Sequence, residues 1–334
     1  MAEALVETKD VQVRYGRGRR THVAVDGVDL TVSAGETVGL VGESGSGKSS
    51  LGNAILGMVP VSGGDVWFDG ERITGATRAD RRRLSRRMQV VFQDPYGSMN
   101  PARTIADTLA EPLHHTLRLS RADIDGRIEQ ALSDVGLETS VLRRYPGDFS
   151  GGQRQRIAIA RAIALEPDFL VCDEAVSALD LSVQAQVLNV LARLRAERGL
   201  AYLFISHDLS VVRFLADRIV VMYAGRVVEQ GPSTAVIDRP AHPYTQLLLS
   251  AAPVPDPAAQ AVRREARRHR SVGTTLPVRA GACAFVARCP FAQQRCHDER
   301  PVLLPHQDGT AVACHRSDEI AALTLDDPVT ADRS

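Results

Sequence analysis

Residues 42–49 read Gly42-Glu43-Ser44-Gly45-Ser46-Gly47-Lys48-Ser49, an instance of the pattern G-x-x-x-x-G-K-S. An apolar strand pattern, 37–41, precedes the loop, and a helix pattern through Leu51 to Leu56 follows it. Glycines let backbone N–H groups face phosphate oxygens, and a helix N-terminus favours negative charge. Lys48 would neutralise the β- and γ-phosphates, and the Ser49 hydroxyl would coordinate Mg²⁺. The loop predicts a nucleotide site that includes Gly42, Ser44, Gly45, Ser46, Gly47, Lys48, Ser49 and Ser50, with a chance Gly-rich turn as the alternative.

An acidic pair, Asp173-Glu174, follows the apolar strand pattern 169–172. In open α/β sheets the ligand lies at the carboxyl ends of parallel strands. Asp173 is then expected to reach Mg²⁺ through water, and Glu174 to act as general base on the attacking water. The alternative is a solvated strand end. The preceding Cys172 is expected to belong to the core.

A second candidate for anion binding is the segment Phe149-Ser150-Gly151-Gly152-Gln153. Ser150 is expected to cap a helix, and the two glycines would bring its first N–H groups close to an anion. Because the chain already has one phosphate loop, this second helix end indicates a γ-phosphate shared between two subunits. An ordinary helix cap is the alternative.

The order of elements predicts an α/β fold with a mostly parallel sheet flanked by helices. Antiparallel strands are expected at the N-terminus, between Val11 and Leu40, and a helical subdomain at about 101–150. Further elements are expected at 89–92 (strand), from Ser150 to Pro167 (helix), 169–172 (strand), 183–198 (helix) and 201–206 (strand). A change in composition after Pro240 divides the chain into a domain at 1–239 and a cysteine-bearing extension at 240–334.

Composition limits the classes of function. The 334 residues contain 44% hydrophobic and 24% charged side chains, as in ordinary globular proteins. Lys+Arg and Asp+Glu both number 40, so the balance lacks the basic excess of a nucleic-acid binder. We find no signal-peptide pattern at the N-terminus and no apolar run near the roughly 20 residues that span a bilayer. Work at a membrane would therefore require docking onto another chain.

Taken together, the phosphate loop, Gln93, the Ser150–Gln153 segment, Asp173-Glu174, Asp180 and His207 resemble the motif set of ABC ATPases. The resemblance implies that Gln93 contacts Mg²⁺ and responds to the transmembrane partner. It also implies that Asp180 belongs to a loop that communicates between the two subunits of an ATPase dimer. It implies that His207 contacts the γ-phosphate. Tyr15 resembles the aromatic residue that stacks on adenine, with strand packing as the alternative.

Three segments resemble the oligopeptide/dipeptide permease branch, and the resemblance covers roughly residues 5 to 320. They are 92–101 (FQDPYGSMNP), 176–180 (VSALD) and His242-Pro243-Tyr244. Tyr96 and Val176 resemble the second of two ATPase subunits, which implies a heterodimer. The chain departs from the branch at Ala175 and at Gly147-Asp148, none of which matches a catalytic position.

The partners implied by the resemblance are a second ABC ATPase subunit, two transmembrane permease subunits and, indirectly, an extracytoplasmic substrate-binding protein; no nucleic acid is expected. The implied location is peripheral, at the cytoplasmic face of the cell membrane. We interpret the basic run Arg78 to Arg87 as a solvated face beside the permease-docking region.

Four cysteines of the extension, Cys283, Cys289, Cys296 and Cys314, are spaced C-x₅-C-x₆-C-x₁₇-C. This spacing is wider than that of most structural zinc sites. Four thiolates suit a [4Fe–4S] cluster, which the resemblance implies for some branch members. Zinc and unligated thiols are the alternatives.

The motifs thus predict an ATP-hydrolysing subunit, and the resemblance to the permease branch implies that it serves an importer for di- or oligopeptides. Another cargo such as a nickel chelate, an exporter, and a soluble ABC ATPase acting on DNA or ribosomes are the alternatives. A DNA-repair ATPase would need a long coiled coil between Ser49 and Ser150, and that segment is too short for one. The ribosomal type resembles two ATPase cassettes in one chain, whereas this sequence has one.

Overall fold

The computed structural model describes residues 4–16, 18, 21–94, 97–251 and 281–322. The chain forms two compact units, each assembled from three segments. Unit 1 comprises Met1–Val13, Asp29–Thr37 and Ser49–Ile205, and unit 2 comprises Arg14–Val28, Val38–Lys48 and Ser206–Ser334. Within the described ranges, no helix combines the length and apolarity needed to cross a membrane.

The antiparallel strands of unit 1 confirm the expected N-terminal β subdomain. β1 (Ala4–Tyr15) pairs with β4 (Gly63–Phe68), which pairs with β5 (Glu71–Arg72), and β2 (His22–Ser33) lies on the other side of β1. β1 and β4 bury one face, where Val6 lies opposite Phe68. β4 and β5 follow the phosphate loop in sequence, where no strand was predicted.

Three parallel strands form the second sheet region of unit 1: β6 (Met88–Val91), β7 (Phe169–Asp173) and β8 (Ala201–Ser206). Their side chains are apolar almost throughout because helices cover both faces of a parallel sheet. The register places Val91 beside Cys172 and Asp173 beside Ile205, so these strands end close together.

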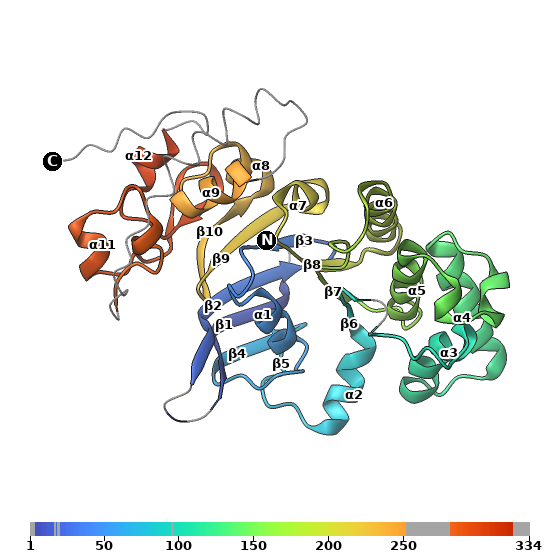
Figure 1. Ribbon diagram of the computed structural model, residues 1–334. Helices are drawn as coiled ribbons and strands as arrows, with labels where there is room; N and C mark the ends of the chain where they lie inside the picture. Colours follow the sequence, from blue (N-terminus) through green and yellow to red (C-terminus); the bar gives the residue numbers. More distant parts are fainter. Residues whose placement is uncertain (1–3, 17, 19–20, 95–96, 252–280, 323–334) are drawn as a thin grey trace. The chain divides into compact units, whose positions relative to one another are not determined.

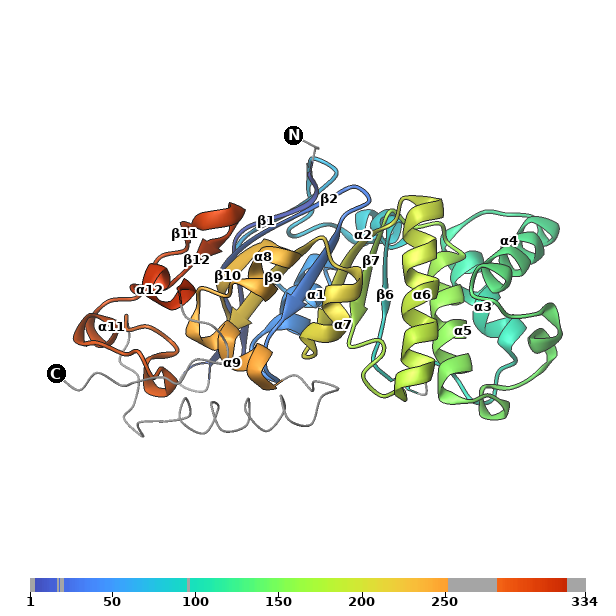
Figure 2. The same ribbon diagram turned by 90° about the horizontal axis from the view of Figure 1, so that it is seen from above.

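The segment predicted as a helical subdomain, about 101–150, contains α3 (Ile105–Thr116) and α4 (Arg121–Asp134). The helix predicted after Ser150 is α5 (Gly151–Ile163), which lies beside them in Figure 1. Short 3₁₀ helices at Thr139–Arg143 and Pro146–Asp148 connect α4 to α5. α5 ends four residues before Pro167, earlier than expected, and α6 (Leu181–Arg198) runs beside it (Figure 2).

Two other helices belong to unit 1. α1 (Lys48–Ile55) follows the phosphate loop, as predicted. The basic run is α2 (Arg78–Arg87), in which Leu84 is the buried side chain and most of the arginines are exposed. Thr77 and Asp80 form a capping box that begins this helix, a signal present in the sequence.

Among the described residues of unit 2, five strands lie in the order β3-β9-β10-β12-β11. Their bounds are β3 (Thr37–Val41), β9 (Arg218–Tyr223), β10 (Arg226–Pro232), β12 (Ala311–Val312) and β11 (Leu304–Pro305). β3 and β9 are parallel and the others antiparallel. The cysteine-bearing extension therefore contributes strands to the same sheet region as β3, which leads into the phosphate loop.

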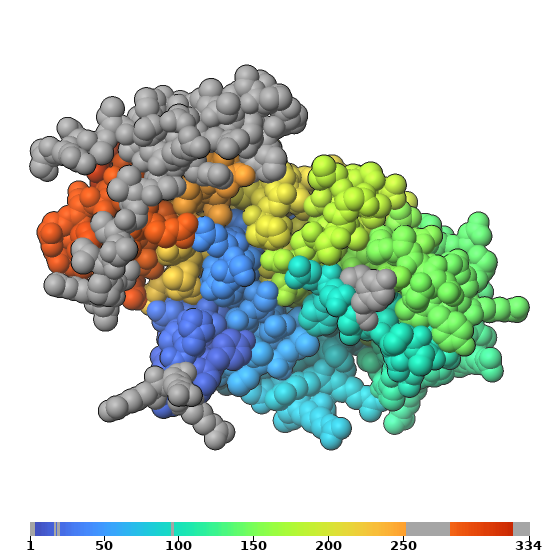
Figure 3. Space-filling view, viewed as in Figure 1, coloured from blue at the N-terminus to red at the C-terminus, as the bar shows by residue number. Residues whose placement is uncertain are grey.

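The helices in the described part of unit 2 are short: α7 (Leu209–Leu215), α8 (Ser233–Asp238), α9 (Pro243–Ala251), α11 (Gln294–Asp298) and α12 (Ser317–Ala321). A 3₁₀ helix at Val286–Arg288 precedes α11. Residues 281–322 gather into one lobe, coloured orange to red in Figure 3.

Candidate functional site

The phosphate loop begins directly after β3 and requires glycine at two positions. Gly42 and Gly47 have φ values of 154° and 102°. A Cβ atom at Gly42 would lie 2.3 Å from the carbonyl oxygen of Met222, and one at Gly47 would lie 2.1 Å from that of Ala24. Larger side chains are therefore excluded by neighbouring backbone, which fixes the loop against β9 and β2.

Lys48 is nearly enclosed, with 4% of its surface exposed. Its Nζ donates hydrogen bonds to the carbonyl oxygens of Gly42 and Glu43, both at 2.8 Å. The phosphate loop therefore closes around the Lys48 ammonium, the group that the sequence predicts to neutralise the phosphates. Ser44 and Gly45 are exposed at the loop tip, whereas Ser46 is buried.

In unit 1, the Ser49 hydroxyl donates a hydrogen bond of 2.9 Å to Oδ1 of Asp173, 124 residues away in sequence. A hydroxyl and a carboxylate are the hard oxygen donors that Mg²⁺ prefers. The chain therefore brings together two of the three residues predicted to hold the metal. Ser50, next to Ser49, is half-buried.

Glu174 has a φ of 49°, an uncommon value for a residue other than glycine. Its N–H donates to the carbonyl oxygen of Ile205 at 3.0 Å, which anchors the turn at the end of β7. Strained backbone of this kind persists where the surrounding structure enforces it, and such positions are frequent at functional sites. Gln93 is exposed just beyond β6, the strand next to β7.

Ser150 caps α5 as predicted. Its Oγ accepts a hydrogen bond from the Gln153 N–H, and the Gln153 side chain accepts one from the Ser150 N–H at 3.0 Å. Gly151 is exposed, whereas Gly152 is buried against Val183 of α6. The first turn of α5 therefore keeps an exposed surface over the Ser150 cap.

Asp180 caps the neighbouring helix α6, where its Oδ1 accepts a hydrogen bond of 3.0 Å from the Val183 N–H. This bond and one from the Ser182 hydroxyl hold the pKa of Asp180 below its ordinary value. In unit 2, His207 is exposed and directly follows Ser206, the last residue of β8. Tyr15 is 40% exposed at the end of β1. Tyr96, one of the branch-specific positions, lies outside the described residues, and Val176 is buried.

All four cysteines of the extension line one small cavity, together with His242 and His315. Burial raises the pKa of Cys289 to about 12 and that of Cys314 to about 11. The donor set fits a thiolate-bound group. As the described side chains are placed, however, no three His, Cys, Asp or Glu residues come within range of a common metal ion.

Three residues at the phosphate loop were not predicted as part of the site. Glu43 accepts two hydrogen bonds from Arg288, and its N–H donates to the hydroxyl of Tyr244. An acidic residue inside an anion-binding loop was the available signal, because it requires a compensating cation. The sequence separation of 245 residues concealed which cation it is.

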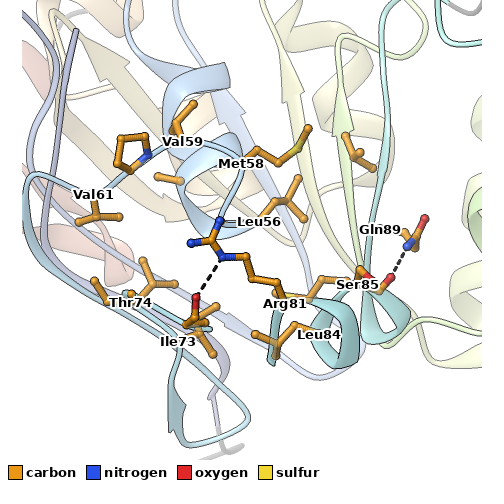
Figure 4. A pocket seen from close by; sticks show the side chains of 18 residues that line it. Leu56, Met58, Val59, Val61, Ile73, Thr74, Arg81, Leu84, Ser85 and Gln89 are labelled. Carbon is orange, nitrogen blue, oxygen red and sulfur yellow. Dashed lines mark hydrogen bonds between the residues drawn. The ribbon is translucent and has the colours of Figure 1, made fainter. Parts of the chain in front are cut away.

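A separate cavity of about 460 Å³ lies in unit 1 between the end of α1, β4 and α2 (Figure 4). Its lining is largely apolar and includes Leu56, Met58 and Leu84. Arg81 crosses it and donates from Nε to the carbonyl oxygen of Ala76 at 3.0 Å. The residues predicted to bind nucleotide do not line this cavity.

The strand–loop–helix arrangement around Lys48, with a serine hydroxyl hydrogen-bonded to an acid at the end of a parallel strand, defines a P-loop nucleoside triphosphatase. The helical subdomain between loop and acid, and its capped glycine pair, agree with the ABC class of these enzymes.

Comparison with known proteins gives the family. The ABC transporter family matches residues 25–177, and the family "Oligopeptide/dipeptide transporter, C-terminal region" matches residues 228–296. A relative from Sinorhizobium fredii, whose name assigns it to peptide ABC transporter ATP-binding proteins, is 48% identical over 94% of this chain and 90% of its own. The oligopeptide transport ATP-binding protein of Streptococcus pneumoniae is 49% identical over 77% of this chain and 84% of its own.

Solved structures agree. A dimeric ATP-binding cassette in a post-hydrolysis state with ADP and phosphate is 29% identical, has a TM-score of 0.62, and covers 68% of this chain and 98% of its own. A subunit of an ABC transporter complex from Clostridium perfringens is 26% identical with a TM-score of 0.64, covering 70% and 90%. This chain therefore belongs to the ATP-binding subunits of the ABC transporters, in the oligopeptide/dipeptide branch.

Proposed function

We propose that this chain binds and hydrolyses ATP to drive the import of di- or oligopeptides. The hydrogen bond between Ser49 and Asp173 is the observation that carries the ATPase part, because it pairs a phosphate-loop hydroxyl with a strand-end acid. The names of the relatives, which refer to peptide and oligopeptide transport, support the cargo.

The proposed nucleotide site combines the loop with residues at strand ends. The triphosphate would contact Gly42, Ser44, Gly45, Ser46, Gly47, Lys48, Ser49 and Ser50, and adenine would stack on Tyr15. Ser49, Gln93 and Asp173 would hold Mg²⁺, directly or through water, and the bound ion would supply positive charge to the β- and γ-phosphate oxygens.

In the proposed reaction, Glu174 accepts a proton from water as the water oxygen bonds to the γ-phosphorus. The bond from that phosphorus to the β–γ bridging oxygen breaks, and ADP and inorganic phosphate result. Lys48 and His207 would stabilise the negative charge on the transferring group. Catalysis of this kind depends on positioning and charge compensation rather than on a covalent intermediate.

We further propose that the site is completed by a second ATPase subunit. Ser150, Gly151, Gly152 and Gln153 would approach the γ-phosphate held by that subunit, and Asp180 would contact it across the interface. The exposed start of α5 and the dimeric state of a solved relative support this arrangement. A different ATPase chain is the proposed partner, so that the assembly is a heterodimer.

The proposed complex contains two transmembrane permease subunits, with an extracytoplasmic binding protein delivering the cargo. This chain would lie peripherally at the cytoplasmic face of the membrane. We propose that residues 1–239 form the nucleotide-binding domain, with its helical subdomain at about 101–150, and that 240–334 form the extension. The basic helix α2 is the proposed solvated face beside the permease-docking region, and the apolar cavity next to it is proposed to belong to that docking region.

For the extension we propose an iron–sulfur group held by Cys283, Cys289, Cys296 and Cys314. The convergence of the four thiols on one cavity supports it. The test is the iron and acid-labile sulfide content of anaerobically purified full-length protein, compared with its Cys289→Ser variant. Zinc without sulfide, or no metal at all, would contradict the iron–sulfur assignment.

Uptake assays test the transport function. Cells that carry Glu174→Gln should lose uptake of one peptide class from a labelled panel of dipeptides, longer peptides and nickel chelates. Loss of the general base is expected to lower hydrolysis by about 10²- to 10⁴-fold. A Glu129→Gln variant, altered on the exposed face of α4, should transport normally. Unchanged uptake of every substrate with membrane-bound mutant protein would contradict import of these cargoes, and selective loss of nickel uptake would replace the peptide assignment.

A further inference from the structure

Glu43 lies at the second position of the phosphate loop, where a carboxylate is electrostatically unfavourable for binding a polyanion. Its backbone carbonyl accepts one of the two hydrogen bonds that hold the Lys48 ammonium. The Glu43 carboxylate therefore repels the triphosphate, whereas the Glu43 carbonyl positions the Lys48 ammonium that attracts it.

Arg288 compensates this carboxylate in a bidentate pair. Its two terminal nitrogens donate to the two Glu43 carboxylate oxygens at 2.7 Å and 2.8 Å. The pair holds the pKa of Glu43 below its ordinary value. This parallel geometry is the strongest arrangement between a guanidinium and a carboxylate.

The backbone of Glu43 is held separately. Its N–H donates to the Tyr244 hydroxyl at 2.7 Å. The Tyr244 ring is fully buried and packs against Tyr223 and Phe285, with centroid distances of 4.6 Å and 5.5 Å. Arg288 lies over two of these rings, 5.9 Å from Tyr223 and 5.7 Å from Phe285. A packed aromatic cluster thus supports the Tyr244 hydroxyl and the Arg288 guanidinium, the two groups that bind Glu43.

The ion pair itself contributes little to folding, because both side chains are more than 40% exposed. Its consequence should therefore appear in ligand binding rather than in thermal stability. We propose that Arg288 and Tyr244 of the extension are positioning residues that neutralise and hold Glu43, so that the phosphate loop is preformed for the triphosphate. The extension then sets the ATP affinity of the subunit. This inference rests on the proposed nucleotide site.

The test uses the full-length chain assembled with its partner subunits and a non-hydrolysable ATP analogue with Mg²⁺. Arg288→Met leaves the Glu43 charge uncompensated and should weaken analogue binding by about five- to tenfold. The KM for ATP should rise in parallel, whereas kcat at saturating ATP should stay within about twofold, since the hydrolytic groups are untouched. Tyr244→Phe, which removes only the hydroxyl, should also weaken binding.

A second substitution separates charge compensation from a general structural effect. In Arg288→Met/Glu43→Gln the opposing charge is gone, so affinity should return to within about twofold of the wild type. The matched control is Arg239→Met, which breaks an exposed ion pair between the residue just before the extension and Asp308 within it, and should bind normally.

Two results would overturn the inference while the nucleotide site stands. One is wild-type affinity in Arg288→Met, and the other is a double variant that binds as weakly as the single one. If the wild-type complex itself binds no analogue, the nucleotide site is wrong and this inference falls with it.

Discussion

Lysine occurs only at Lys9 and Lys48 in a chain whose other basic residues are arginines. The two lysines differ in environment. Lys9 pairs with Glu7 on the surface, with 60% of its side chain exposed, whereas Lys48 is enclosed by the loop that it closes. A compact ammonium fits two carbonyl oxygens within one loop, and a planar guanidinium does not.

We therefore predict that Lys48→Arg lowers ATP affinity by at least about tenfold although the charge is retained. Lys9→Arg, the same exchange at an exposed position, should bind ATP as the wild type does. Fluorescent-nucleotide titration of both variants measures the difference. Equal affinities would show that charge alone is needed at position 48.

At the scale of elements, the contact between α5 and α6 is determined by a glycine. A Cβ atom on Gly152 would lie 2.0 Å from Cγ1 of Val183, in the first turn of α6. On the adjacent Gly151, the nearest atom would be Cδ2 of Leu179 at 3.6 Å, an ordinary contact. The two glycines of the pair therefore have different structural roles.

Gly152→Ala is expected to destabilise the protein by about 1–3 kcal/mol, because the stiff valine cannot move aside without separating the helices. Gly151→Ala should be neutral or slightly stabilising, since alanine favours the helix. Thermal unfolding measures both without reference to activity. Equal melting temperatures for the two variants would contradict the packing argument.

At the scale of the whole molecule, one buried acid links stability to pH. Glu229 of β10 is fully buried and accepts hydrogen bonds from the N–H groups of Ala241 and His242, at 2.7 Å and 3.1 Å. Burial outweighs these bonds and raises the pKa of Glu229 to about 7. The folded state thus keeps a proton that the unfolded chain releases above pH 4.5.

The contribution of Glu229 to the free energy of unfolding is fully present below about pH 4.5 and is lost as the pH rises through about 7. Glu229→Gln, neutral at every pH, should remove this loss, so that the free energy of unfolding falls less between pH 5 and pH 8. The difference is expected to be on the order of 2 kcal/mol. Urea unfolding at both pH values measures it, with Glu129→Gln as the exposed control. An unchanged pH dependence in Glu229→Gln would contradict the buried-acid explanation.

Several parts of this protein could be predicted from local spacing along the chain. The phosphate loop, the Ser150 cap and the acid-ended strand were all predicted, because each is defined within about ten consecutive residues by hydrogen-bonding and steric preferences. The buried strands were predicted from continuous apolar runs. The basic helix α2 was seen only as a charged run, although Thr77 and Asp80 signal its start.

Which distant segments meet could not be predicted from local spacing and is seen in the folded chain. It pairs Ser49 with Asp173, brings four widely spaced cysteines to one cavity, and joins Glu43 to Arg288 across 245 residues. It also places β12 of the extension on β10. Such contacts arise when folding closes long loops, and their partners are selected by packing and charge compensation in three dimensions, which leave no fixed spacing in the chain.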